Sequence, residues 1–215
     1  MQASNPDNLV ELLRAMVRID SVNGSVSGRS CAEAELGDWL EKTATGWGLT
    51  TRRIPVAGRA DQLLITHEAG EDRPWLMFVS HMDTVAVDGM TVEPFGGELR
   101  DGKIFGRGAC DTKGTGAAML WAMKQYASDG NAQYPAAKNI ALLFSVDEEV
   151  GMRGVASFLN NDFAAMKFNP QNLRGVIVGE PTELHPVIAH HGLIRWKVIT
   201  HGLAAHSSVP HAGKS

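Results

Sequence analysis

The sequence contains little cysteine and lacks both a long apolar run and a basic cluster. Its two cysteines, Cys31 and Cys110, are too few and too far apart for a disulfide framework. No apolar stretch approaches the roughly 20 residues of a membrane-spanning helix, so we expect no membrane partner. The net charge is −4 with neutral histidines, and without a basic stripe we expect no nucleic-acid partner. Residues 1–6 lack the features of a signal peptide, so we expect a cytoplasmic protein.

Apolar residues recur with two alternating spacings along the chain. Short apolar runs predict strands at 49–56, 63–67, 76–79, 139–146 and 175–178. Helical spacing predicts helices at about 8–20, 30–46, 112–127 and 151–160. The glycine-rich stretch 88–108 is expected to be mostly loop, with a short edge strand at 103–105. This alternation predicts an α/β fold in which helices cover both faces of a mostly parallel sheet.

Three of the expected strands are buried, and each ends in residue types that bind metal ions. Parallel strands bring their carboxyl ends to one edge of a sheet, where open α/β folds place their chemistry. A fourth such residue follows the glycine-rich loop, at the start of a helix. The residues concerned are His81 and Asp83, then Asp111, then Glu148 and Glu149, then Glu180. The sequence therefore predicts a metal site at this edge.

The residue types within the site suggest separate tasks. His81 and Asp83 are two residues apart, which in a strand puts them on one face, and a metal-binding histidine needs a partner that orients its ring. One histidine with several carboxylates suits Zn²⁺ or a similar divalent ion. The adjacent Glu148 and Glu149 cannot point the same way, so one can bind metal while the other accepts a proton from water.

Plainer interpretations exist for several of these residues. Considered alone, His81 and Asp83 would be a surface pair in a turn. Cys110 is expected to be a packed thiol rather than a ligand. Asp147 is expected to be a solvated or hydrogen-bonded neighbour of the two glutamates. The metal interpretation depends on the combination of all the strand ends, because none of them is specific by itself.

Five motifs appear in a fixed order along the chain. They are His81-x-Asp83, Gly106-Arg-Gly-Ala-Cys-Asp111-Thr-Lys-Gly114, Glu148-Glu149-x-Gly151, Gly179-Glu180-Pro-Thr182 and Gly202-Leu-Ala-Ala-His206-Ser-Ser. In these motifs, from about residue 10 to its end, the sequence resembles the M20 family of di-zinc peptidases and amidohydrolases. The fourth motif looks most like that of the acetylornithine deacetylase branch. Succinyl-diaminopimelate desuccinylase is an enzyme of the same type within this family.

The resemblance implies a fold and a domain division. Residues 1–188 would form the N-terminal portion of a three-layer αβα catalytic domain of the zinc-exopeptidase type. Residues 189–215 would begin an inserted α+β lid, or dimerisation, domain. The family takes a further metal-binding histidine from beyond the lid, and after His206 this sequence offers only His211, an unsuitable substitute. We therefore expect the N-terminal part of a longer enzyme that forms a homodimer.

The resemblance also implies the metal ligands. His81 and Glu180 would hold one zinc ion, Glu149 would hold the second, and Asp111 would bridge the two. Co²⁺ and Mn²⁺ are further candidates for the same site. The peptide bond between Asp111 and Thr112 is expected to be cis, as in the family.

Three other residues would take part in the reaction. Asp83 would orient His81, and Glu148 would be the general base and acid. His206 would reach from the lid into the partner subunit's site to steady the oxyanion.

The implied function is hydrolysis of the amide bond of a small N-acyl amino acid by a zinc-activated water, as in an acetylornithine deacetylase. A dipeptidase or carboxypeptidase acting on short peptides is the alternative within the family. An alternative of another class is an incomplete, inactive chain that binds metal or a partner chain.

Overall fold

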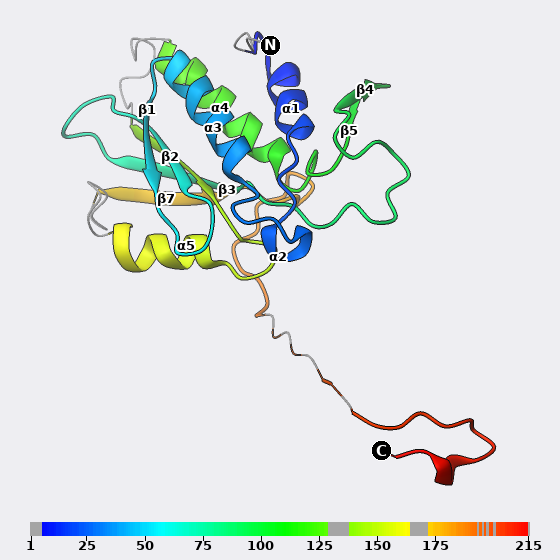
Figure 1. Ribbon diagram of the computed structural model, residues 1–215. Coiled ribbons are helices and arrows are strands. Elements are labelled where there is room, and N and C mark those ends of the chain that lie inside the picture. The colour runs from blue at the N-terminus through cyan, green and yellow to red at the C-terminus, as the bar shows by residue number, and fades with distance from the viewer. Residues whose placement is uncertain are drawn as a thin grey trace. The chain divides into compact units, whose positions relative to one another are not determined.

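A computed structural model describes residues 6–128, 138–163 and 172–214, apart from 193, 195, 197 and 200 (Figure 1). The chain divides into two compact units, Met1–Pro181 and Thr182–Ser215. The first unit contains the sheet, the helices that cover it and all but one of the expected site residues. The second unit contains His206 and is described separately below.

The regular elements of the first unit follow the expected alternation. The helices are α1 (Leu9–Arg18), α2 (Gly24–Ser27), α3 (Ala34–Gly46), α4 (Lys113–Ser128) and α5 (Arg153–Ser157), which a π-helical turn at Phe158–Asp162 continues. The strands are β1 (Thr50–Ile54), β2 (Gln62–His67), β3 (Trp75–His81), β4 (Glu98–Arg100), β5 (Lys103–Phe105), β6 (Asn139–Ser145) and β7 (Leu173–Val178). The short helix α2 was not expected, and α3 begins later than position 30.

The central sheet has the strand order β1-β2-β6-β3-β7. β6 and β7 both run parallel to β3, whereas β2 is antiparallel to β6 and β1 is antiparallel to β2. Four of these five strands therefore run in one direction, and β2 alone is reversed. This confirms the prediction of an α/β fold with a mostly parallel sheet.

Helices pack on both faces of the sheet, giving three layers (Figure 1). On one face α1, α3 and α4 bury a core that includes Leu12, Leu36, Leu120 and Phe144. On the other face the α5 segment buries Phe158 in a second core with residues of β3 and β6. Burying an apolar side chain of this size contributes about 2–3 kcal/mol, so both cores stabilise the layered arrangement.

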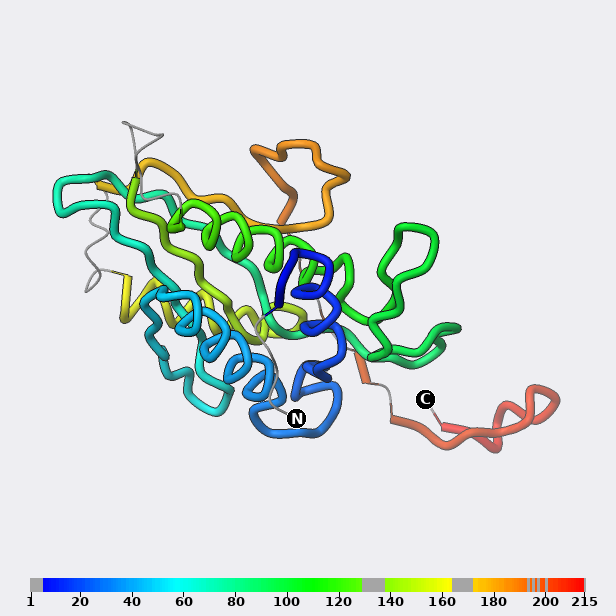
Figure 2. The backbone as a smooth tube through the Cα atoms, turned by 90° about the horizontal axis from the view of Figure 1, so that it is seen from above, coloured from blue at the N-terminus to red at the C-terminus, as the bar shows by residue number. Residues whose placement is uncertain are grey.

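Close packing fixes α4 against the sheet. A Cβ atom at Gly116 would lie 2.8 Å from Phe144 and 2.9 Å from Ser80, so only glycine allows this approach. α1 lies beside α4 on the same face (Figure 2). The Nζ atom of the buried Lys113 donates to the carbonyls of Met16 and Ile19 at 3.0 and 2.7 Å. These contacts join the first residues of α4, next to Asp111, to the end of α1.

The expectation that all three site-bearing strands are buried is wrong for β7. β6 is buried along its whole length, but Val176, Ile177 and Val178 are 47–59% exposed. The reason is the strand order, because within the described residues β7 has a neighbour on one side only. Among the described residues, no helix is both long enough and apolar enough to span a membrane.

The second unit has little regular structure in its described part. Leu203 and Lys214 pair as an isolated antiparallel bridge, and a 3₁₀ turn spans Pro210–Ala212. The assignment of 189–215 as the start of a lid, and the boundary at 188, stay predictions.

Candidate metal centre

His81 is the last residue of β3 and is buried, with 3% of its surface exposed. Its Nδ1 atom lies 2.9 Å from the backbone carbonyl oxygen of Asp83 and 3.6 Å from the carboxylate oxygen Oδ1 of that residue. Because a carbonyl oxygen can only accept, Nδ1 carries the proton in the neutral ring. The other nitrogen, Nε2, then has a free lone pair, which is the form in which histidine binds a metal.

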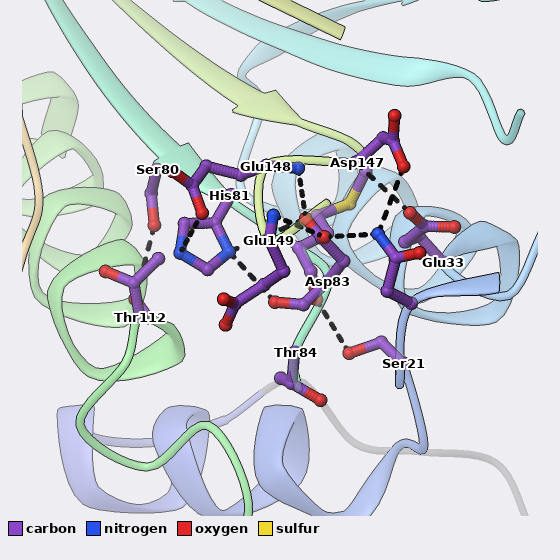
Figure 3. Close-up of polar contacts among 12 residues, drawn as sticks. Ser21, Glu33, Ser80, His81, Asp83, Thr84, Thr112, Asp147, Glu148 and Glu149 are labelled. Carbon is purple, nitrogen blue, oxygen red and sulfur yellow. Dashed lines mark hydrogen bonds and ion pairs between the residues drawn. The ribbon is translucent and has the colours of Figure 1, made fainter. Parts of the chain in front are cut away.

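Carboxylates from three other segments surround Nε2 of His81. The Nε2 atom of His81 lies 3.3 Å from Oδ1 of Asp111, 3.9 Å from Oε2 of Glu148 and 3.9 Å from Oε1 of Glu180. Glu149 completes the group, since its carboxylate and the ligand atoms of His81 and Asp111 all lie within 4.8 Å of one another. Figure 3 shows the side chains of His81, Glu148 and Glu149 facing a common space. The four expected metal ligands therefore lie together.

Asp111 is held by the start of α4. Its peptide bond to Thr112 is cis, as the resemblance implied. The hydroxyl of Ser80 in β3 donates a hydrogen bond to the backbone carbonyl of Thr112 at 3.2 Å. The side-chain hydroxyl of Thr112 donates in turn to the backbone carbonyl of Gly179. Asp111 is consequently fixed between the ends of β3 and β7, next to Glu180.

The carboxylate of Asp83 holds the turn that follows β6. It is fully buried and accepts the backbone N–H of Glu148 at 3.0 Å and that of Glu149 at 3.1 Å (Figure 3). Burial alone would raise the pKa of Asp83, but hydrogen bonds from His81, Asn23 and Glu148 outweigh it and lower that pKa. Asp83 thus contacts both His81 and the two glutamates. Its role in orienting His81 stays a prediction.

The electrostatics of the cluster favour a cation. Burial raises the pKa of Glu149 and of Glu180, and although His81 acts against this, the nearby charges of Asp111 and Glu148 raise both further. Neighbouring carboxylates therefore repel one another here. A divalent ion would relieve that repulsion, and one histidine with several carboxylates is a suitable donor set for Zn²⁺. The residues present fit a metal centre.

Comparison with known proteins identifies the family. The model of the peptidase family M20/M25/M40 matches residues 77–205, which is more than half of the chain and includes every residue of the cluster. The chain belongs to this family. A peptidase M20 domain-containing protein of Schizosaccharomyces pombe is 32% identical over 215 residues, covering 97% of this chain and 47% of that protein. A probable carboxypeptidase of Emericella nidulans is 32% identical over 213 residues, and the match covers 96% of this chain and 47% of that protein.

The M20 relatives are longer than this chain, which spans about half the length of the curated proteins that it matches. Among solved structures, an M20 family metallo-carboxypeptidase from Sulfolobus solfataricus matches with a TM-score of 0.63 at 20% identity. The match covers 81% of this chain and 37% of that one. At this identity the likeness establishes the shared fold.

The M20 site should take up metal in a pH-dependent manner. Burial lowers the pKa of His81, but the hydrogen bond and charge of Asp83, with the charges of Glu148 and Glu180, raise it to about 9. The metal-free ring is thus protonated at pH 7, and a metal must displace that proton. We expect zinc affinity to rise about tenfold per pH unit from pH 7 to about 9 and then to level off. Titration against a competing chelator would measure this, and an affinity independent of pH over that interval would contradict it.

One residue beside this M20 site was missed from the sequence, and the surroundings of another were left open. Of the two expectations for Asp147, the hydrogen-bonded one is confirmed. The residue is fully buried, its carboxylate accepts a hydrogen bond from Asn23, and it pairs with Arg59 and Arg153 at 3.2 Å each. Asn23 was not considered at all, although it contacts Asp147 from a distant part of the chain. No local pattern marks either residue. The expectation of a packed thiol is wrong for Cys110, which is exposed because it lies in the loop before α4.

His206, the remaining expected site residue, lies in the second unit of this M20 chain. Its Nδ1 atom is 2.8 Å from Oγ of Ser208 and accepts the backbone N–H of Ser208 at 3.2 Å. The proton of the neutral ring is therefore on Nε2. Its role in a partner's site stays a prediction.

Proposed function

We propose that this chain provides the catalytic half of a metal-dependent hydrolase that cleaves the amide bond of a small peptide. The supporting observation is the convergence of His81, Asp111, Glu149 and Glu180 at the carboxyl ends of β3 and β7 and the segments beside them. Residues from four separate parts of the chain meet there, and all are of metal-binding type.

Two zinc ions are the proposed cofactors, with Co²⁺ or Mn²⁺ as substitutes. His81 and Glu180 would hold one ion, Glu149 the other, and Asp111 both. A divalent ion in such a site polarises a carbonyl group and lowers the pKa of water.

Glu148 is the proposed general base and acid. The carboxylate of Asp83 accepts its backbone N–H, and its carboxylate oxygen Oε2 lies 3.9 Å from Nε2 of His81. Glu148 therefore faces the proposed metal ligands but is not one of them. It would accept a proton from the attacking water and pass it to the leaving amine. His206 of a second subunit would stabilise the oxyanion in a homodimer of the complete enzyme.

Carboxypeptidase-type cleavage of short peptides is the substrate assignment that the relatives favour, since one is named a probable carboxypeptidase. A deacetylase acting on N-acetylornithine is the second candidate. The Gly179-Glu180-Pro181-Thr182 segment supports it, because this string resembles that branch of the family. Both reactions cleave an amide bond in a small substrate, and in either case the protein is proposed to be cytoplasmic.

The alternative of another class is that this chain binds metal or a partner chain without turning over a substrate by itself. The cluster of His81, Asp111 and Glu149 supports metal binding in this case too.

Hydrolysis assays separate these candidates. The zinc-loaded chain would be given an N-acylated dipeptide with a free carboxyl end, the matching C-terminal amide, and N-acetylornithine. We expect cleavage of the first alone, abolished by chelation. Preferred cleavage of N-acetylornithine would favour the deacetylase. No cleavage of any substrate by a chain with zinc bound would contradict the proposed activity and leave the binding alternative.

A further inference from the structure

Asn23 connects two buried carboxylates that are far from it in sequence. Its side-chain amide nitrogen donates to Oδ2 of Asp83 at 2.7 Å and to Oδ1 of Asp147 at 3.2 Å. These partners are 60 and 124 residues away along the chain. Asn23, Asp83 and Asp147 are each fully buried. The amide lies between two groups that would otherwise repel each other.

Asn23 is itself held firmly. Its backbone N–H donates to the carbonyl of Thr84 at 2.9 Å, next to the bridge between Val22 and Thr84. Its side-chain oxygen accepts the backbone N–H of Ser25 at 2.9 Å and caps α2. The side chain therefore has a fixed orientation, with both amide hydrogens directed at the two carboxylates.

Both carboxylates act on the turn that presents Glu148 and Glu149. Asp83 accepts the backbone N–H groups of those two residues, and Asp147 immediately precedes them. Asp147 is held in addition by Arg59, whose Nε lies 3.2 Å from the same oxygen that Asn23 contacts. Asn23 thus touches both of the groups that determine where this turn lies.

We infer that Asn23 is a positioning residue, which sets the turn carrying Glu148 and Glu149 by clamping Asp83 to Asp147. This inference rests on the proposed function, because it assigns Asn23 a part in metal binding and proton transfer. Asparagine suits the task, since it supplies two donors on one nitrogen and an acceptor for the cap. Aspartate would keep the cap but place a third carboxylate between two others.

Asn139 provides a matched control for a substitution at Asn23. It is also asparagine, is 1% exposed, and begins β6 at the end of the strand away from the site. Its side chain accepts from the backbone of Ala69 and Gly70 and donates to the carbonyls of Gly70 and Arg73. Removing either asparagine costs buried hydrogen bonds, but only Asn23 contacts the site.

The test compares zinc affinity in this chain and in the variants Asn23→Ala, Asn23→Ser and Asn139→Ala, by titration against a chelator, with a thermal melt of each. We expect both Asn23 variants to bind zinc at least about 10-fold more weakly. This is the usual effect of losing a residue that positions the metal ligands without binding the metal itself. Asn139→Ala should lower stability and leave zinc affinity within about twofold. Asn23→Ser retains the cap of α2 and is the variant to use if Asn23→Ala does not fold.

Two results would overturn the inference. One is an Asn23→Ser chain that is folded and binds zinc as tightly as the unaltered chain. The other is an equal loss of zinc affinity in the Asn139→Ala chain, since that would attribute the effect to general destabilisation. A third result, an unaltered chain that binds no zinc, would contradict the proposed function itself. It is therefore distinguishable from the two results that contradict the role of Asn23.

Discussion

Replacing Glu148 with glutamine should abolish the proposed hydrolysis while leaving the metal bound. Glutamine has the size of glutamate but cannot accept the proton of the attacking water. General acid–base catalysis contributes about 10²–10⁴-fold, so kcat should fall by roughly 10³-fold or more. The backbone N–H that Asp83 holds is unchanged, so the turn should keep its position. Steady-state kinetics with elemental analysis of the same sample would measure both quantities.

Glu149→Gln is the matched comparison for this prediction. The two glutamates are adjacent and both of their N–H groups are bound by Asp83, but only Glu149 is within the ligand group with His81 and Asp111. Glu149→Gln should lower metal affinity as well as activity. Activity of Glu148→Gln within about tenfold of the unaltered enzyme, with zinc intact, would show that Glu148 is not the base.

Replacing Asp111 with asparagine should remove most metal binding and leave the fold intact. Its carboxylate is the one closest to His81, at 3.3 Å from Nε2, and is proposed to bind both ions. Removing a residue that only hydrogen-bonds to a metal ligand lowers metal affinity about 10–100-fold. Removing a ligand itself should therefore lower the affinity about 100-fold or more. Its side chain is 54% exposed, so the free energy of unfolding should change by only about 0.5 kcal/mol. Zinc titration and thermal melts of the metal-free proteins would measure the two effects.

Asp101→Asn is the control for Asp111→Asn. Asp101 is also exposed, lies in the same long segment between β3 and α4, and has a φ of 51° that asparagine adopts well. It should leave zinc affinity unchanged. Equal affinities in the Asp111→Asn and Asp101→Asn chains would exclude Asp111 as a ligand.

The parts of the site that the sequence could predict are those fixed by strand direction. β3, β6 and β7 are parallel, so residues just past their ends must meet at one edge, and local apolar runs marked those ends to within two residues. Asp111 was included from its place between the glycine-rich loop and a helix, because no strand end indicates it.

The parts that escaped prediction depend on contacts between distant segments. Nothing around Asn23 or Asp147 in sequence signals that they meet, because their contact follows from the way the N-terminal loop packs against the turn after β6. The exposure of β7 depends on the strand order, which the order of elements along the chain does not give. Burial of Lys113 likewise depends on the packing of α4 against α1.

Zinc-edge anomalous diffraction from crystals of the zinc-loaded chain would test the proposed metal centre most directly. We expect anomalous peaks at about 2.0–2.2 Å, the usual zinc–ligand distance, from Nε2 of His81 and from carboxylate oxygens of Asp111, Glu149 and Glu180. Zinc found only elsewhere on the molecule, with these four side chains binding none, would contradict the account.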